Sequence, residues 1–351
     1  MNLQEWSQIK AKPLNVETEQ AALSHQGNLT KPPGSLGVLE KIAVQMAAMQ
    51  AQPLPSADRI SISIFAADHG VAAQNVSAFP QEVTSQMILN FAEGGAAIAV
   101  LAKQLKAQFE VINLGTVVPV NHHNVLNRVI ASQSDDISKS QAMNSEQLVT
   151  ALNVGQEAVL RAKSSGAQLF IAGEMGIGNT TVAATVLAAA MNLTAQEVVG
   201  AGTGVSGDAL EHKTAVIDQA LKLHQCTDDS PFELLQSLAG FEIVAMVGAY
   251  LTAAREGITV VVDGFISTAA AYMASIICPL AKDWMIFGHQ SAEKFHHKVL
   301  VAMSAEPLLA LDMRLGEGSG AATAVSVIQT ACLLHKKMAT FSSAGVSEKS
   351  D

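Results

Sequence analysis

Five short, nearly continuous apolar runs constrain the fold of this 351-residue chain more than any other feature of its sequence. They are rich in β-branched residues, and longer Ala-rich stretches of helical character separate them. Strands that are apolar on both faces and alternate with helices are typical of a parallel sheet covered on both sides. The sequence therefore predicts an open α/β sheet. The runs span residues 60–70, 109–115, 168–174, 258–264 and 284–289.

The two ends of the chain carry helical patterns without strands. We expect residues 1–55 and 306–351 to pair as a smaller helical domain. Residues 56–305 would form the large α/β domain, which carries most of the functional site. The polar stretch 131–146 predicts a surface loop.

Composition excludes several classes of protein. The chain is 49% hydrophobic and 15% charged, whereas a disordered chain has low hydrophobicity and high charge. Its 31 acidic and 21 basic residues give a net charge of −10 without any Lys/Arg block, which argues against a nucleic-acid partner. The longest uncharged run, residues 265–281, is short for a bilayer span and contains Pro279. We predict a buried core helix there and no membrane partner.

The expected compartment is the cytoplasm. The first residues contain no apolar core of a secretory signal and no Arg-rich transit helix. The three cysteines, Cys226, Cys278 and Cys332, are scattered and form no CxxC pair, so we expect neither a disulfide framework nor a zinc knuckle. A reducing compartment fits this cysteine usage.

Charged residues or histidines follow most of the predicted strands. In an open α/β sheet, ligands bind beyond the carboxyl ends of the strands, so these residues are candidates for a site. Each could instead cap a helix or bond within a loop, and for the aspartate that precedes Gly264 the two interpretations stay open. The candidates are Asp68, His69, Glu174, Asp263 and His289.

Three glycine-rich segments can approach a ligand closely. The first, residues 173–181, joins a predicted strand to an Ala-rich helix, whose first amides lack partners and attract anions. It lacks the GK[ST] ending of a P-loop, so ATP hydrolysis is not indicated. The candidate phosphate-binding residues in this segment are Gly176, Gly178, Asn179 and Thr180.

The second segment contains a literal GxGxxG from Gly202 to Gly207. Only a short apolar stretch precedes it and no acidic residue stands at the ribose distance, so it is a weak dinucleotide fingerprint. Lys213 follows as a point charge suited to a phosphate, although a lone Lys is usually a solvated surface residue.

Glu317 stands between glycines in the third segment, residues 314–320. A carboxylate in this setting gains nothing for packing. Close approach of the backbone to a ligand is the better explanation, so Glu317 is a candidate for catalysis.

Several histidines lie close together near residue 290. His289 and Glu293 are four residues apart, and His296 and His297 follow. The spacing is neither HExxH nor a carboxylate-rich cage, so we predict a polar network and no metal site.

Eight long motifs follow one another along nearly the whole chain. In this order they resemble the nicotinate-nucleotide:dimethylbenzimidazole phosphoribosyltransferases, the CobT family of cobalamin nucleotide-loop assembly. One departure is Lys294-Phe295-His296, where the family commonly has Pro-Gly-His. The motifs are TKPPGSLGVLEKIA, FAADHGVAAQNVSAFPQEVTSQMILNFAEGGAA, AGEMGIGNTTVAA, GAGTGVSGDALEHKTAVI, GFEIVAMVGA, VVDGFISTAAA, GHQSAE and LDMRLGEGSGAA.

The resemblance implies transfer of the 5-phosphoribosyl group from nicotinate mononucleotide to 5,6-dimethylbenzimidazole, which gives α-ribazole 5′-phosphate and nicotinate. It also implies a doubly wound, Rossmann-like parallel sheet with a small helical domain. The family acts as a homodimer without metal or organic cofactor, so we expect the same here.

The resemblance also implies roles for individual residues. Glu317, in a loop where the two domains meet, matches the family's catalytic base, and Glu174 is a second carboxylate near the same site. The phosphate and nucleotide are expected against Gly176, Gly178, Asn179, Thr180, Gly202, Gly204, Lys213 and Asp263. The apolar acceptor is expected against Ser77, Phe79, Gln86, Met87 and Leu315, although packing alone would also explain Phe79 and Met87.

The chemistry gives Glu317 its task. Nicotinate leaves with a stable neutral pyridine nitrogen, so its departure needs little acid help and the transition state is expected to resemble an oxocarbenium ion at C1′. If the benzimidazole attacks with one nitrogen while the other keeps its proton, a cation forms. A carboxylate that removes this proton lowers the barrier.

Two other functions stay open at this point. A nucleotide-dependent oxidoreductase would use the GxGxxG segment. A nonenzymatic binder of phosphorylated metabolites would keep the anion-binding loops and would not need Glu317.

Overall fold

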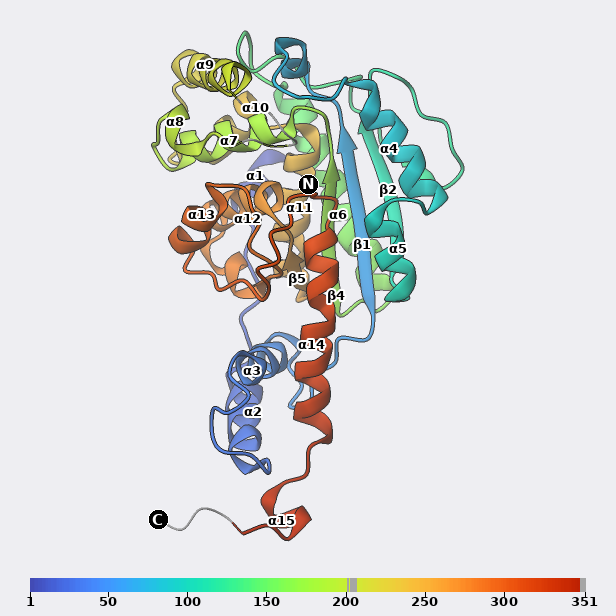
Figure 1. Ribbon diagram of the computed structural model, residues 1–351, viewed down its shortest axis with the longest axis vertical. Helices are drawn as coiled ribbons and strands as arrows, with labels where there is room; N and C mark the ends of the chain where they lie inside the picture. The colour runs from blue at the N-terminus through green and yellow to red at the C-terminus, as the bar shows by residue number, and fades with distance from the viewer. Residues whose placement is uncertain (201, 203–206, 348–351) are drawn as a thin grey trace.

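A six-stranded parallel sheet forms the centre of the molecule, with its strands in the order β3-β2-β1-β4-β5-β6 (Figure 1). This computed structural model describes residues 1–200, 202 and 207–347. All five predicted strands are present, and the predicted parallel α/β architecture is confirmed. The strands are β1 (Ile60–Ala67), β2 (Gln108–Gly115), β3 (Val125–Asn127), β4 (Leu169–Met175), β5 (Thr259–Val262) and β6 (Met285–Phe287).

The sequence did not predict β3. This strand has three residues and pairs with β2 alone, from Val111↔Val125 to Asn113↔Asn127. The Asn113 side chain donates to the Asn127 side-chain oxygen at 2.9 Å and so adds to this pairing. So short an edge strand has no hydrophobic run of its own, and only its pairing defines it.

The strand order reverses between β1 and β4, which makes the sheet doubly wound. β1 is buried along its whole length and pairs with β2 on one side and β4 on the other. The register aligns Phe65 with Glu174 and Ala66 with Met175, so the two central strands end at the same level. In sheets of this kind the ligand crevice lies beyond such a reversal.

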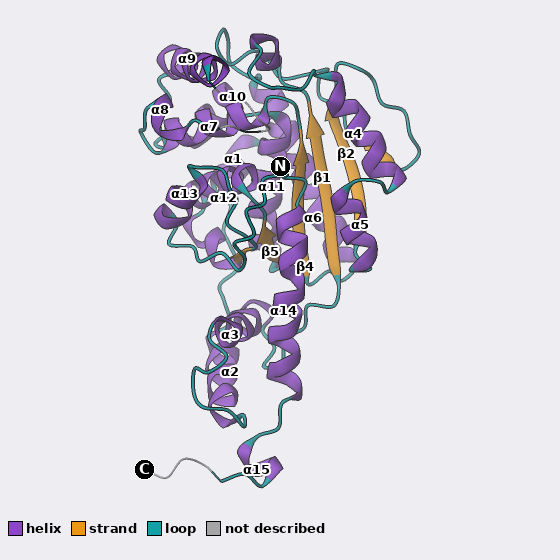
Figure 2. Cartoon of the chain, viewed as in Figure 1, coloured by secondary structure: helices purple, strands orange, loops and turns teal. Residues whose placement is uncertain are grey.

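Helices cover both faces of the sheet (Figures 1 and 2). The helices along the described chain are α1 (Leu3–Ser7), α2 (Val16–Asn28), α3 (Val38–Gln50), α4 (Glu82–Glu93), α5 (Ala97–Gln104), α6 (Ser145–Ser164), α7 (Asn179–Ala190), α8 (Ala195–Val198), α9 (Asp208–His224), α10 (Pro231–Leu238), α11 (Phe241–Glu256), α12 (Phe265–Ile277), α13 (His296–Ala302), α14 (Ser319–Lys337) and α15 (Phe341–Ala344), with 3₁₀ turns η1 (Gly70–Gln74) and η2 (Pro279–Trp284). α11 packs on β1, β4 and β5, and Gly248 lets it approach the α6 backbone closely.

Helices from both ends of the chain pair beyond the lower edge of the sheet in Figure 1. His25 Nε2 bonds to the carbonyl oxygen of His335 at 2.8 Å, and Gln26 Nε2 bonds to its Nδ1 at 2.7 Å, which ties α2 to α14. α1 lies elsewhere, because Trp6 Nε1 donates to Asn153 Oδ1 on α6 at 3.2 Å. The expected domain boundaries at residues 56 and 305 stay a prediction.

The polar residues of the stretch 131–146 predict a surface loop, but the structure differs. Ser134 N donates to Asp68 O at 3.0 Å, and Gly70 N donates to Ser134 O at 2.8 Å, so its backbone continues the pairing beyond β1. Ile137 within it is buried. The loop is therefore partly embedded, because backbone hydrogen bonds that leave no trace in the residue pattern hold it against the sheet.

One described stretch, Glu82–Gln104, is long and apolar enough by composition to cross a membrane. The structure divides it into α4 and α5, of 12 and 8 residues, with a left-handed turn at Gly94 between them. Each is shorter than the roughly 20 residues that a spanning helix needs, and both pack on β2. The uncharged run predicted as a core helix is α12, which is largely buried.

Candidate functional site

A cavity of about 310 Å³ opens beyond the carboxyl ends of β4, β5 and β6. Glu174 from β4, Asp263 after β5 and His289 after β6 all line it, as strand-end residues of an open α/β sheet are expected to do. The loop before α14 and the start of α7 complete its wall. The predicted site residues among its lining are Phe79, Met87, Glu174, Gly176, Asn179, Thr180, Gly202, Asp263, Leu315 and Glu317.

Glu174 is buried in the wall of the cavity. Its Oε2 accepts a hydrogen bond from Asn179 Nδ2, and its Oε1 accepts one from the backbone N of Glu317 at 3.4 Å. Burial, together with the charges of Asp263 and Glu242, raises the pKa of Glu174 to about 8. Most molecules therefore keep this carboxyl protonated at neutral pH.

Glu317 occupies a strained loop directly above β4. Its φ is 64°, and the flanking Gly316 and Gly318 have φ of 83° and 84°, so three successive residues are left-handed. A Cβ on Gly173 of β4 would collide with the Glu317 carbonyl, so glycine at 173 lets the loop lie on the strand. Seven other non-glycine residues in the described chain also have positive φ, so it is the position of Glu317 in the cavity lining, and not its φ alone, that marks it as a site residue.

Glu317 lines the cavity, and one oxygen of its carboxyl group lacks a hydrogen-bond partner in the described part of the chain. Its Oε2 is buried and has no hydrogen-bond partner among the residues that the structure describes. Burial and the charge of Asp263 raise the pKa of Glu317, although the backbone N–H of Ile98 opposes the shift. A buried carboxyl with an open acceptor and a raised pKa is suited to take a proton from a ligand.

Asp263 holds the Glu317 loop in place. Its Oδ1 accepts from Ala321 N at 2.7 Å and its Oδ2 accepts from Gly318 N at 3.2 Å, so it caps the first turn of α14. Of the two interpretations left open by the sequence, these bonds support helix capping. The cap belongs to a helix far along the chain and not to α12, which follows Asp263 directly. The expected contact of Asp263 with the nucleotide stays a prediction.

The start of α7 and Lys213 together form an anion-attracting corner. Gly178, with φ 99°, precedes the first residue of α7 and leaves the first amides of the helix free of any side-chain cap. Lys213 is buried and is not the solvated surface lysine that the sequence also allowed, because its Nζ donates to Thr180 Oγ1 at 2.9 Å. Burial lowers the pKa of Lys213 to about 8, against the opposing charge of Glu293.

Glycine at 202 is required by this corner. A Cβ there would lie 2.8 Å from Thr180 Oγ1 and 3.2 Å from Lys213 Nζ. Gly204, which was expected to contact the nucleotide, lies outside the described residues. The GxGxxG segment follows α8 and leads into α9, so it lacks the preceding strand that a dinucleotide fingerprint needs.

The opposite side of the cavity is largely apolar. Phe79, Met87 and Leu315 line it as predicted, and Phe79 and Leu315 remain about half exposed at its mouth. Val83, which the sequence analysis missed, stands one helical turn before Met87 on α4 and shares its face. The four-residue spacing between Val83 and Met87 on a helix is the sequence signal that would have predicted Val83 in the lining.

Two residues predicted to contact the acceptor lie outside the lining of the cavity. Ser77 Oγ accepts from Phe79 N at 3.2 Å and shapes the loop before α4. Gln86 is exposed, because successive residues of a helix are rotated by about 100° and its side chain turns away from the face of Met87. The lining also includes residues that were not predicted from the sequence, namely Phe265, Ile266, Ser291, Glu293 and Arg314.

His296 belongs to a hydrogen-bonded network behind the cavity. Its Nδ1 accepts from Ser291 N and its Nε2 bonds to Thr268 Oγ1, each at 2.8 Å. Burial lowers the pKa of His296 to about 3, so the ring is neutral. Across the described residues, no group of three His, Cys, Asp or Glu side chains is placed to hold a metal ion.

Comparison with known proteins agrees with this geometry. Residues 11–346 match a family model described as phosphoribosyltransferase. The nicotinate-nucleotide–dimethylbenzimidazole phosphoribosyltransferase of Pseudomonas savastanoi pv. phaseolicola is 49% identical over 98% of both chains. The enzyme of the same name from Xanthomonas axonopodis pv. citri is 52% identical over 93% of this chain and 94% of its own.

A solved structure shares the whole fold. The crystal structure of the Thermus thermophilus enzyme of this name superposes with a TM-score of 0.90 at 39% identity, and the match covers 96% of this chain and 100% of that one. The chain therefore belongs to the phosphoribosyltransferase family whose curated members are named nicotinate-nucleotide–dimethylbenzimidazole phosphoribosyltransferases.

Proposed function

We propose that this protein transfers the 5-phosphoribosyl group of nicotinate mononucleotide to 5,6-dimethylbenzimidazole, giving α-ribazole 5′-phosphate and nicotinate. Full-length membership of the family supports the reaction. The observation that carries it is Glu317 in the lining of the cavity, a buried carboxyl with one oxygen that has no hydrogen-bond partner among the described residues.

The donor phosphate binds at the start of α7. The helix dipole attracts an anion there, and no side chain caps the first turn of α7. Lys213, whose Nζ donates to Thr180 Oγ1, supplies a positive charge beside it. The ribose then extends into the cavity toward the two glutamates. Asn179 and Gly202 flank this path.

The bond from C1′ to the nicotinate nitrogen breaks, and its electron pair leaves on the neutral pyridine ring. A benzimidazole nitrogen forms the new bond to C1′, and Glu317 takes the proton from the other ring nitrogen. Glu174, whose pKa is raised to about 8, keeps its proton and holds the backbone N of Glu317, so it supports the base without competing for the role.

The acceptor packs against Phe79, Val83, Met87 and Leu315. These side chains offer apolar contact without hydrogen-bond specificity, so they select the base by shape.

The working enzyme is a homodimer in the cytoplasm. Phe79 and Leu315 are about half exposed at the cavity mouth, and Leu23 and Leu333 on the terminal helices are similarly exposed, as expected of surfaces that a second copy covers. The free thiols Cys226, Cys278 and Cys332 suit a reducing compartment. Light scattering after size exclusion measures the oligomeric state directly.

One experiment tests the function. The protein is mixed with nicotinate mononucleotide and dimethylbenzimidazole without NAD or metal, and nicotinate and α-ribazole 5′-phosphate are measured by liquid chromatography. Equimolar formation of both products is expected. Binding of the nucleotide without product would instead favour a nonenzymatic metabolite binder.

A further inference from the structure

A buried pair of a histidine and a glutamate lies beside the anion-attracting corner, and the proposed chemistry does not use it. His69 follows β1, and Glu242 stands in the first turn of α11. His69 Nε2 lies 3.0 Å from Glu242 Oε1, and both side chains are 0% exposed. Neither residue lines the cavity, so neither can touch a substrate there.

The imidazole ring supports the turn that follows β4. A Cβ on Gly176 would lie 2.8 Å from His69 Nε2, and a Cβ on Gly178 would lie 3.6 Å from His69 Cβ. On its other side the ring contacts Gly240, where a Cβ would lie 2.8 Å from Nδ1. The ring is therefore clamped between the phosphate-binding turn and the start of α11.

Charge fixes the ring in this place. Burial alone would lower the pKa of His69, but the carboxylates of Glu242 and Asp68 outweigh it and raise that pKa. Asp68 is itself held by a bond from Val117 N to its Oδ2 at 2.9 Å. A buried carboxylate without a cation is costly, so Glu242 and His69 each need the other.

We propose that His69 and Glu242 are positioning residues for the donor nucleotide. The pair fixes the position of the turn from Gly176 to Gly178 relative to β1 and α11. That position in turn determines the direction in which the first amides of α7 face the phosphate. Ile177 N, which donates to Thr84 Oγ1 at 3.1 Å, fixes the other edge of the turn. This inference rests on the proposed function.

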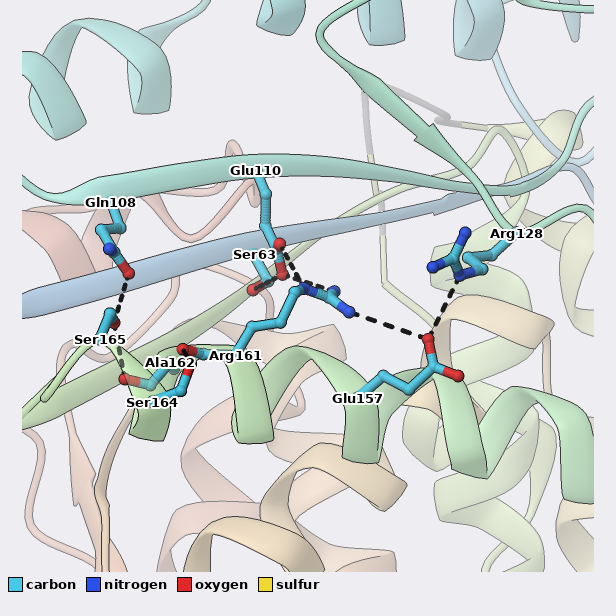
Figure 3. Close-up of polar contacts among 9 residues, drawn as sticks. All are labelled: Ser63, Gln108, Glu110, Arg128, Glu157, Arg161, Ala162, Ser164 and Ser165. Carbon is cyan, nitrogen blue, oxygen red and sulfur yellow. Dashed lines mark hydrogen bonds and ion pairs between the residues drawn. The ribbon is translucent and has the colours of Figure 1, made fainter.

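The test compares His69→Gln and Glu242→Gln with a matched control. The control is Glu110→Gln, which removes one carboxylate from an ion pair between β2 and α6. There Arg161 Nε donates to Glu110 Oε2 at 2.9 Å and Ser63 Oγ donates to Glu110 Oε1 at 2.7 Å (Figure 3). Each variant loses a buried or half-buried charge partner, but only the first two disturb the turn.

Steady-state kinetics should divide the variants. In His69→Gln and Glu242→Gln the KM for nicotinate mononucleotide should rise by about ten- to a hundredfold, as for a displacement of about 1 Å, while the KM for dimethylbenzimidazole changes by less than about threefold. In Glu110→Gln both values should match wild type. The double variant should melt above either single variant, because it leaves no unpaired buried charge.

Each failure has its own signature. Wild-type protein that releases no nicotinate would refute the proposed function. If the wild-type protein is active and the folded His69→Gln and Glu242→Gln variants keep its KM for the nucleotide, this inference alone is refuted. The pair would then only stabilise the fold. If His69→Gln does not fold, Glu242→Asp carries the test, because it keeps the charge, shortens the reach and should raise the nucleotide KM less than Glu242→Gln.

Discussion

Replacing Glu317 by glutamine tests the proposed base with the smallest change of shape. Glutamine fills the same space and cannot accept the proton, so kcat should fall by roughly 10²- to 10⁴-fold, which corresponds to about 2.7 to 5.5 kcal/mol in the barrier. Glu317 Oε2 has no hydrogen-bond partner among the described residues, and the amide oxygen of glutamine can still accept from the backbone N–H of Ile98. Both KM values should change far less than kcat, because the loss belongs to the transition state.

The same substitution should not destabilise the fold. Burial raises the pKa of Glu317 above its ordinary value of 4.5, so the folded protein binds this proton more tightly than the unfolded chain does. The stability linked to this group is therefore highest at low pH and falls as pH rises from 4.5 through the raised pKa. Glutamine has no such dependence. The melting temperature of the Glu317→Gln variant should therefore rise relative to that of wild type as pH rises across that window.

The assay is nicotinate release followed by liquid chromatography, with melting temperatures measured in the same buffers. Glu174→Gln is the matched variant, because it removes the other carboxyl of the site. The reasoning is refuted if Glu317→Gln keeps turnover within a few fold of wild type while Glu174→Gln abolishes it. The base would then belong to β4.

Three further outcomes are expected. Lys213→Ala should raise the KM for nicotinate mononucleotide by roughly 10- to 150-fold, equivalent to about 1.5 to 3 kcal/mol for one charge-assisted contact, and a change confined to the base would remove Lys213 from the phosphate site. Because burial lowers the pKa of Lys213 to about 8, the wild-type KM for the nucleotide should climb as pH passes that value and the lysine loses its charge, whereas the Lys213→Ala profile should lack this climb. Unsubstituted benzimidazole should still react, at a loss of about 1 to 3 kcal/mol per methyl at most in kcat/KM, and its complete rejection would contradict a pocket that reads shape.

Strands with long buried runs could be predicted from the sequence, and so could the edge of the sheet at which the site lies. β1 is buried at every position because both its faces are covered, and six of its eight residues are apolar, which is a local pattern. β3 could not be predicted, since its three residues become a strand only by pairing with β2. The burial of the loop around Ser134 depends in the same way on bonds to residues after β1.

Some features of the site could likewise be predicted from the local sequence and others could not. Glycines around Glu317 are a local signal, because left-handed backbone restricts which residues can stand there. The bonds from Asp263 to Gly318 N and Ala321 N are not local, and no spacing rule predicts which distant amides a carboxylate will reach. The rotation of α4 decides which of its side chains line the cavity, and Gln86 is not among them. The expected contact of Gln86 with the acceptor stays a prediction.

α14 connects the loop of the proposed base, Glu317, to the helices at the two ends of the chain. Its 19 residues span about 28 Å, and His335, which bonds to α2, lies two residues before its carboxyl end. A tilt of one degree about the far end would move the Glu317 loop by about 0.5 Å, a large fraction of the tolerance for aligned reacting groups. The hydrogen bonds that α2 makes to His335 therefore help to set the position of the Glu317 loop. A substitution of His335 is expected to lower the rate of the reaction although His335 does not line the cavity.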